Sequence, residues 1–269
     1  MKRIIGFFIV LILGWACSSD SDTEGTVVVD PINEVSFERS AMLINWADNI
    51  IIPSYEAFST DLDLLIDSFD AFKENPNEDN LVKFRSSWIS AYSSWQHVAM
   101  FEIGPAETVG FQLNMNIYPT NTDNIDEFIT TGTYDLSLSS NRSSKGFPAL
   151  DYLLNGLGEN DAEILAFYNN GTNNTVFTYT EDVLLDMKSL IGTVLTDWKE
   201  GYRDTFVAND GASSTSSVDR MVNDYIFYYE KYLRAGKMGI PLGVFSGSTL
   251  PQNVEAYYDG TISADLFLE

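Results

Sequence analysis

The sequence predicts an all-α protein. Two observations support this prediction: apolar residues recur every three or four positions in several long segments, and no segment alternates convincingly between apolar and polar residues. Hydrophobic residues make up 45% of the 269-residue chain, which is enough to bury a large core. No pattern repeats at a fixed spacing, so we expect bundles of long helices.

The N-terminal half contains the clearest helical patterns. Residues 35–72 have an apolar stripe, which Pro53 must kink or break because proline lacks a backbone N–H. Residues 75–78 form a turn that can cap the next helix. That helix is predicted from Leu81 to Ala99, and Gly104-Pro105 ends it.

The remaining chain alternates weaker and stronger patterns. Residues 104–147 lack a strong period, and we expect a long, partly ordered connection with one short helix at 125–129. Further helices are predicted at 148–156, 162–168, 183–198 and 218–232.

The first sixteen residues are predicted to be a signal peptide. Lys2 and Arg3 precede the apolar run 4–13, which is too short to span a membrane in a folded protein. A small residue directly before Cys17, the only cysteine, resembles a bacterial lipoprotein cleavage site. Cys17 is therefore the predicted lipidation site, and a disulfide is excluded within the chain. The alternative is an ordinary signal peptide with an incidental cysteine.

Three regions follow from this interpretation. After the signal peptide 1–16, residues 17–34 comprise the lipidated cysteine and a flexible acidic tether. The tether resembles the acidic stretch that directs some bacterial lipoproteins to the outer face of the outer membrane. Residues 35–269 form the helical domain, with a first bundle at about 35–140 and a second at about 141–269.

The chain is strongly acidic. Its 15 Lys and Arg against 39 Asp and Glu give a formal charge of −24, and loss of Lys2 and Arg3 with the signal peptide would leave 13 against 39, or −26. Such a surface repels phosphate backbones, which excludes nucleic acid as a partner, and it also repels anionic lipid. It favours cations, including metal ions, although solubility alone also accounts for it.

Few residue types are left for catalysis. His97 is the only histidine, so a multi-histidine zinc site and an HExxH motif are excluded, and a lipidated Cys17 excludes thiol catalysis. A metal site would need carboxylate, amide or tyrosine oxygens, which suit Ca²⁺, Mg²⁺, Mn²⁺ or ferric iron. The candidate acids are Glu102, Glu107, Asp151, Asp219, Asp224 and Glu230, and the helically spaced tyrosines are Tyr225, Tyr228, Tyr229 and Tyr232; solvated helix charges and core packing are the alternatives.

Six segments, in order, resemble the imelysin family. They are IIPSYEAF (51–58), LVKFRSSWISAYSSWQHVAMFEIGP (81–105), NIYPTNTDNIDEFI (116–129), KGFPALDYLL (145–154), KMGIPLG (237–243) and VEAYYDGTISADL (254–265). The resemblance implies a secreted or lipid-anchored protein made of two four-helix bundles. It also implies a family first described as peptidases, with members linked to iron uptake. Family chains usually continue beyond the last segment, so the second bundle is expected to be incomplete here, with apolar helix faces exposed.

The family hallmark is Gly-x-His-x-x-Glu, whose His and Glu are the proposed metal site. Here Gly146 matches the glycine, Pro148 stands at the histidine and Asp151 at the glutamate. Positions three apart share a helix face, which is how His and Glu could chelate together. The proline side chain has no donor atom, so the resemblance implies a degenerate motif. Its residues Gly146, Pro148 and Asp151 would then bind a ligand without being catalytic. For Asp151 the alternative is a favourable place near a helix N-terminus.

These observations predict a non-catalytic, imelysin-like outer-membrane lipoprotein. It would bind a ligand or partner protein, with iron or another divalent cation as the candidate cofactor and a link to iron uptake. Arg85, Trp88, His97 and Glu102 are the candidate lining of a cleft beside the motif. The alternatives are a metal-dependent peptidase of the imelysin type, which the loss of the histidine disfavours, and a structural or adhesive surface protein.

Overall fold

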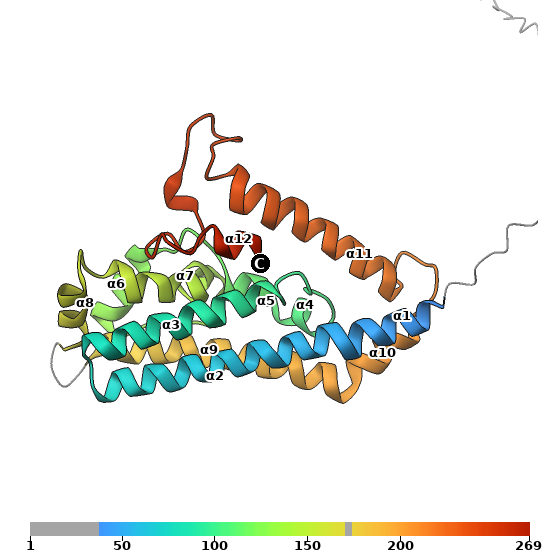
Figure 1. Ribbon diagram of the computed structural model, residues 1–269, viewed down its shortest axis with the longest axis horizontal. Coiled ribbons are helices and arrows are strands. Elements are labelled where there is room, and N and C mark those ends of the chain that lie inside the picture. The colour runs from blue at the N-terminus through green and yellow to red at the C-terminus, as the bar shows by residue number, and fades with distance from the viewer. Residues whose placement is uncertain (1–37, 170–173) are drawn as a thin grey trace, which may run out of the picture. The chain divides into compact units, whose positions relative to one another are not determined.

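The computed structural model describes residues 38–169 and 174–269. The predicted signal peptide, Cys17 and the tether lie outside the described residues. Every regular element within the two described ranges is helical, which confirms the all-α prediction (Figure 1). None of the helices in these ranges is both long and apolar enough to cross a membrane.

The helical elements follow one another closely along the chain. The α-helices are α1 (Arg39–Trp46), α2 (Ile52–Glu74), α3 (Glu78–Gln96), α4 (Pro105–Val109), α5 (Phe111–Met115), α6 (Thr122–Thr131), α7 (Gly146–Asp151), α8 (Asp161–Tyr168), α9 (Thr175–Asp197), α10 (Arg203–Ala208), α11 (Ser217–Phe227) and α12 (Asp265–Leu268). The π-helical stretches are η1 (Ala47–Ile51), η3 (Tyr152–Gly156), η4 (Trp198–Tyr202) and η5 (Tyr228–Gly239), and the 3₁₀ turns are η2 (Ser139–Ser144) and η6 (Pro251–Asn253).

Pro53 does not break the first helix. It lies in the first turn of α2, where the missing N–H costs least, and the π-helical turn η1 directly precedes it. A π-helical turn inserts one extra residue into the hydrogen-bond ladder. The chain therefore passes from α1 to α2 as one run of helix, so of the two predicted outcomes, a kink or a break, the break does not occur.

Three long helices build the core. The side chain of Asn77 caps α3 by accepting a hydrogen bond from the backbone N–H of Asn80, as the turn at 75–78 predicts. α2 and α3 form a hairpin, and α9 packs along α2 (Figure 1). Their apolar stripes meet in a cluster of fully buried large side chains: Tyr55, Phe58, Phe69, Phe72, Phe84, Trp88, Tyr92, Trp95 and Tyr179.

This core extends across the predicted boundary between the bundles. α9 lies beyond residue 140, yet it packs on α2 and also contacts α4, α5, α6, α7 and α8. Residues 38–269 form one compact unit. The division into two bundles near residue 140 stays a prediction, and the α2–α9 packing joins residues from both sides of it.

The segment 104–147 is more ordered than predicted. It contains α4, α5, α6 and η2, where the sequence predicts only one short helix. Gly104, Gly110 and Gly132 end or begin these helices with positive φ values of 56°, 61° and 64°, a region that favours glycine. α4 and α5 have only five residues each, too few to show a period of 3.6 in the sequence.

α11 and η5 expose apolar residues. Val222, Tyr225, Ile226, Phe227 and Tyr229 are each between 43% and 52% exposed. α11 contacts α1, and Arg220 near its start pairs with Glu107. The expectation of exposed apolar faces in the C-terminal part of the chain is thus confirmed for this helix.

Two leucines on α2 test the packing of the core. Leu62 is fully buried and Leu64, two residues later, is 55% exposed. We expect Leu62→Ala to lower the free energy of unfolding by about 2–5 kcal/mol, because it leaves a cavity. The matched control Leu64→Ala should change it by about 0.5 kcal/mol or less. Urea denaturation measures both, and equal losses would contradict the described orientation of α2.

Candidate functional site

The motif helix α7 begins at a glycine for a steric reason. Gly146 has a φ of 74°, and a Cβ built there would lie 2.2 Å from the carbonyl oxygen of Met115. Only glycine allows this close approach between the start of α7 and the end of α5. The matched hallmark glycine is therefore needed for backbone packing.

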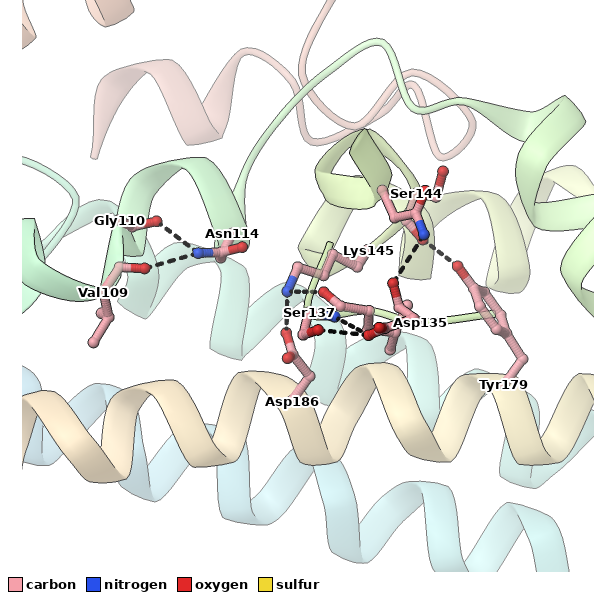
Figure 2. A network of polar contacts seen from close by, with 11 residues as sticks. Val109, Gly110, Asn114, Asp135, Ser137, Ser144, Lys145, Tyr179 and Asp186 are labelled. Atoms are coloured by element: carbon pink, nitrogen blue, oxygen red, sulfur yellow. Dashed lines mark hydrogen bonds and ion pairs between the residues drawn. The ribbon is translucent and has the colours of Figure 1, made fainter. Parts of the chain in front are cut away.

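A buried ion pair fixes the residue before Gly146. Lys145 is 3% exposed, and its Nζ lies 2.8 Å from Asp186 Oδ2 on α9 and 2.8 Å from the carbonyl oxygen of Leu136 (Figure 2). The hydroxyl of Tyr179, also on α9, donates to the carbonyl oxygen of Ser144 (Figure 2). α9 thus holds the N-terminal end of the motif helix.

α3 holds the motif helix from its other side. Trp88 is fully buried, and its Nε1 donates to the carbonyl oxygen of Phe147 at 3.3 Å. The ring of Tyr92 stacks on Phe147 with centroids 4.4 Å apart. Arg85 donates through Nε and Nη2 to the carbonyl oxygen of Leu154, at 3.1 and 2.8 Å, in η3, which directly follows the motif helix.

Asp151 ties α7 to the C-terminal segment. Its carboxylate is 1% exposed and accepts hydrogen bonds from the backbone N–H of Tyr258 at 2.8 Å and of Asp259 at 2.9 Å, and from Asn155 Nδ2 at 3.0 Å. Burial raises the pKa of Asp151 to about 6, although these three hydrogen bonds oppose the shift. Asp151 is the last residue of α7, so the predicted place near a helix N-terminus is wrong.

A second carboxylate holds the same C-terminal segment. Glu255 is 2% exposed; its Oε1 accepts from Asn116 at 2.6 Å and from Gln96 at 3.1 Å, and its Oε2 lies 2.7 Å from Lys237 Nζ. Between the two anchors, Ala256 has a φ of 54°, which non-glycine residues rarely adopt. Such a conformation persists because the chain is held on both sides of it.

Lys237 is held by three oxygen atoms of the protein. Its ammonium group contacts Glu255, Gln96 Oε1 at 2.7 Å and the carbonyl oxygen of Leu266 at 2.5 Å. It therefore donates hydrogen bonds to Gln96 and Leu266 and forms an ion pair with Glu255. Burial lowers the pKa of Lys237, and the charge of Glu255 opposes that shift. The pair links η5, α3 and the C-terminal segment.

A small cavity, here called the motif pocket, lies beside α7. It has a volume of about 170 Å³ and is lined by Pro148 and Asp151, by residues 118–120, and by Gln252, Val254 and residues 256–258. The structure therefore places two of the three motif residues at a pocket. Gly146 serves the backbone packing instead, and ligand binding at this motif stays a prediction.

The candidate cleft residues occupy different environments. Arg85 and Trp88 hold the motif helix, whereas the side chain of His97 is 55% exposed and its Nε2 lies 3.4 Å from Glu269. Glu102 lies in the segment before α4, and its carboxylate accepts from the backbone N–H of Gln112 in α5 at 2.9 Å. The four do not form one cleft beside the motif.

Two of the candidate acids meet near α11. Asp224 Oδ2 accepts from the backbone N–H of Glu102 at 3.0 Å, which joins α11 to the segment before α4. Burial raises the pKa of Glu102 to about 7 and that of Asp224 to about 6, and the negative charge of Glu107 contributes to both shifts. Glu107 itself pairs with Arg220.

Comparison with known proteins identifies the family to which the sequence belongs. The imelysin family matches residues 51–266, most of the chain. The chain belongs to the imelysin family. Two solved structures share the imelysin fold: an iron-regulated protein A precursor from Parabacteroides distasonis (TM-score 0.68, 17% identity) and an imelysin-like protein from Psychrobacter arcticum (TM-score 0.67, 18% identity). The matches cover 85% and 86% of this chain, and 70% and 71% of those chains.

One relative is similar in sequence over a shorter stretch. Iron-regulated protein A of Synechococcus elongatus is 26% identical over 109 residues, which are 40% of this chain and 30% of that protein. The match spans less than a third of the relative's length. The activity and partners of the whole relative therefore do not transfer directly to this imelysin chain.

The residues present do not fit the metal that the imelysin motif implies. Pro148 has no lone pair to donate, and both oxygens of Asp151 already accept N–H groups. In residues 38–169 and 174–269, no three His, Cys, Asp or Glu side chains are grouped as a metal site requires. The donor set of the motif is therefore unsuited to chelation.

Sequence reasoning missed the charged groups that hold the site. Lys145 and Asp186 pair across 41 positions of the chain, and Lys237 pairs with Glu255 across 18. Each basic residue lies beside apolar or small residues, and that is the only signal in the sequence. Because a lone lysine is usually solvated, this signal predicts no pairing by itself.

Asp151→Asn tests the anchor. An amide places N–H groups where the carboxylate accepts them, so at least one buried backbone donor loses its partner. We expect a loss of about 1–3 kcal/mol in the free energy of unfolding and faster hydrogen exchange at Tyr258 and Asp259. The matched control is Asp126→Asn, whose oxygen can still accept from the hydroxyl of Tyr152. Unchanged exchange at 258 and 259 would contradict the anchoring role.

Glu102→Gln tests the carboxylate pair near α11. The pKa of Glu102 is raised in the folded state from 4.5 to about 7, so its contribution to stability is complete below pH 4.5 and is lost as the pH rises through 7. We expect the free energy of unfolding of the wild type to fall between pH 5 and 8. In Glu102→Gln this decrease should be smaller by about 1–3 kcal/mol. Urea titrations at several pH values measure it. Glu127→Gln, on an exposed position of α6, should keep the wild-type slope.

Proposed function

We propose that this chain is a non-catalytic, lipid-anchored binding protein that takes up a ligand at the motif pocket and takes part in iron acquisition. The observation that supports it most is the state of Asp151, whose carboxylate anchors residues 258 and 259. With Pro148 in place of the histidine, the motif keeps a shaped pocket and lacks a chelating pair.

The link to iron rests on the relatives. Two of the similar proteins are named iron-regulated protein A, from Synechococcus elongatus and Parabacteroides distasonis. The acidic surface is in keeping with a cationic cargo, since a charge of −24 concentrates cations near the protein. In this proposal iron is cargo that the protein receives from, or transfers to, a partner protein.

The location is proposed from the N-terminal sequence. A signal peptide at 1–16 would export the chain, and a lipid on Cys17 would hold it to the outer membrane. The acidic tether at 17–34 would keep the helical domain away from an anionic lipid surface. Mass spectrometry of the membrane-bound protein would detect the lipid on Cys17, and a Cys17→Ser variant would be released.

The alternative is a metal-dependent peptidase of the imelysin type. It requires a metal-bound water and a general base close to each other. It would need a donor set built elsewhere, from carboxylates such as Glu102 and Asp224. Those two carboxylates are tied to backbone N–H groups, and this disfavours the alternative.

Restoring the motif tests the proposed function. We expect the wild type to show no EDTA-sensitive peptide cleavage, and the double variant Pro148→His, Asp151→Glu to bind Zn²⁺ at least about tenfold more tightly than the wild type, equivalent to about 1.4 kcal/mol. Calorimetry measures the affinity, and a peptide library measures cleavage. Gln252→His is the control, because it adds an imidazole at the same pocket without the i, i+3 spacing.

Two results would count against the proposal. EDTA-sensitive cleavage by the wild type would favour the peptidase. A thermal-shift screen against Fe²⁺, Fe³⁺, Zn²⁺, Ca²⁺ and haem would test the iron link, since a ligand that binds the native state raises the melting temperature by mass action. A flat response to all iron species would remove iron as the cargo.

A further inference from the structure

The motif pocket has aromatic walls. Tyr118, Tyr257 and Tyr258 line it, together with Pro148. The rings of Tyr257 and Tyr258 lie edge to face with centroids 5.1 Å apart, and the ring of Tyr152 lies 5.1 Å from that of Tyr258. Aromatic faces carry partial negative charge and attract cations, an effect that grows when water is excluded. Three tyrosines around one small cavity therefore favour a positively charged occupant.

The charges around the pocket have the same sign. Asp151 lines it, Asp259 donates its backbone N–H to Asp151, and the hydroxyl of Tyr152 donates to Asp126 at 2.8 Å. The pKa of the Tyr258 phenol is raised, first by burial and then by the charge of Asp151. Among the described residues that line the pocket there is no lysine or arginine. Lys237 forms an ion pair with Glu255, which directly precedes the lining residue Ala256.

The hydrogen bonds already made by Asp151 favour an organic cation over a metal ion as the occupant of the pocket. A divalent metal ion is bound best by several carboxylates, and Asp151 is the only acid among the described residues that line the pocket and already accepts from Tyr258, Asp259 and Asn155. A primary amine would likewise need acceptors for its N–H groups. A quaternary ammonium ion needs neither, because it is weakly hydrated and binds through aromatic faces and a negative field.

We propose that the motif pocket binds a small quaternary ammonium ion, with its cationic head among Tyr118, Tyr257 and Tyr258 and a polar tail toward Thr120 or Gln252. This proposal rests on the proposed binding function and names its ligand class. The cavity of about 170 Å³ limits the ligand to a head group with a short tail. The aspartate of the degenerate motif then acts as a positioning residue, because it holds the segment that carries Tyr257 and Tyr258.

Choline and its neutral isostere 3,3-dimethyl-1-butanol are the probes. They share shape and hydroxyl and differ in charge. We expect calorimetry with the purified chain to show binding of choline, and at least about tenfold weaker binding of the isostere. Equal affinity for the two would mean that the pocket recognises shape and not charge, and would overturn the proposal. An absence of choline binding would overturn it as well.

Tyr257 is the residue to vary, since it is 45% exposed and its loss should not unfold the chain. We expect Tyr257→Leu to weaken choline binding about fivefold to tenfold and Tyr257→Phe to keep it, because phenylalanine retains the aromatic face. Tyr229→Leu on η5, which removes a ring that is 46% exposed, is the matched control and should leave affinity unchanged. An unchanged affinity in Tyr257→Leu would overturn the placement of the cation.

The outcomes distinguish this proposal from the proposed function. If choline does not bind while an iron species raises the melting temperature, the ammonium site is wrong and the iron link stands. If the wild type cleaves peptides in an EDTA-sensitive way, the non-catalytic function is wrong whatever choline does.

Discussion

The site depends on the hydrogen bonds between the Asp151 carboxylate and the backbone N–H groups of Tyr258 and Asp259. Burial disfavours the charged carboxylate, and the hydrogen bonds favour it; burial outweighs them and raises the pKa to about 6. At pH 7 the ionised form still exceeds the protonated form about tenfold. The anchor is therefore charged at neutral pH, and it holds the C-terminal segment against the motif helix.

The two departures from the imelysin motif line the same pocket. Proline at 148 removes a donor, and it places an apolar ring in the pocket wall. Aspartate at 151 is one methylene shorter than glutamate, and its carboxylate accepts hydrogen bonds from the backbone N–H groups of residues 258 and 259. In place of a chelating pair, the motif positions thus contribute an apolar ring and a hydrogen-bonded carboxylate to the lining of the pocket.

The sequence predicted the long helices because their apolar residues repeat over many turns, as in α2, α3 and α9. It also predicted the cap at Asn77 and the ends of η3 and α8 from local residue types. It could not predict α4 and α5, which are shorter than two turns, or the partners of Asp151 and Lys145. Those partners lie 107 and 41 positions away along the chain, and a single sequence carries no information on such pairings. Pro148 and Asp151 were found only through the spacing of a family motif.

The positions of the lysine and arginine side chains determine the electrostatic field at the motif pocket. In a chain with 15 basic and 39 acidic residues, each lysine or arginine that pairs inside the protein neutralises an acid locally and leaves the excess acids elsewhere unscreened. Lys145 and Lys237, 3% and 6% exposed, are both paired in this way. The same two ion pairs hold the start of α7 and the segment 254–259 in place. The contacts that hold the walls of the pocket thus also pair two lysines with acids, and the remaining field favours a cation.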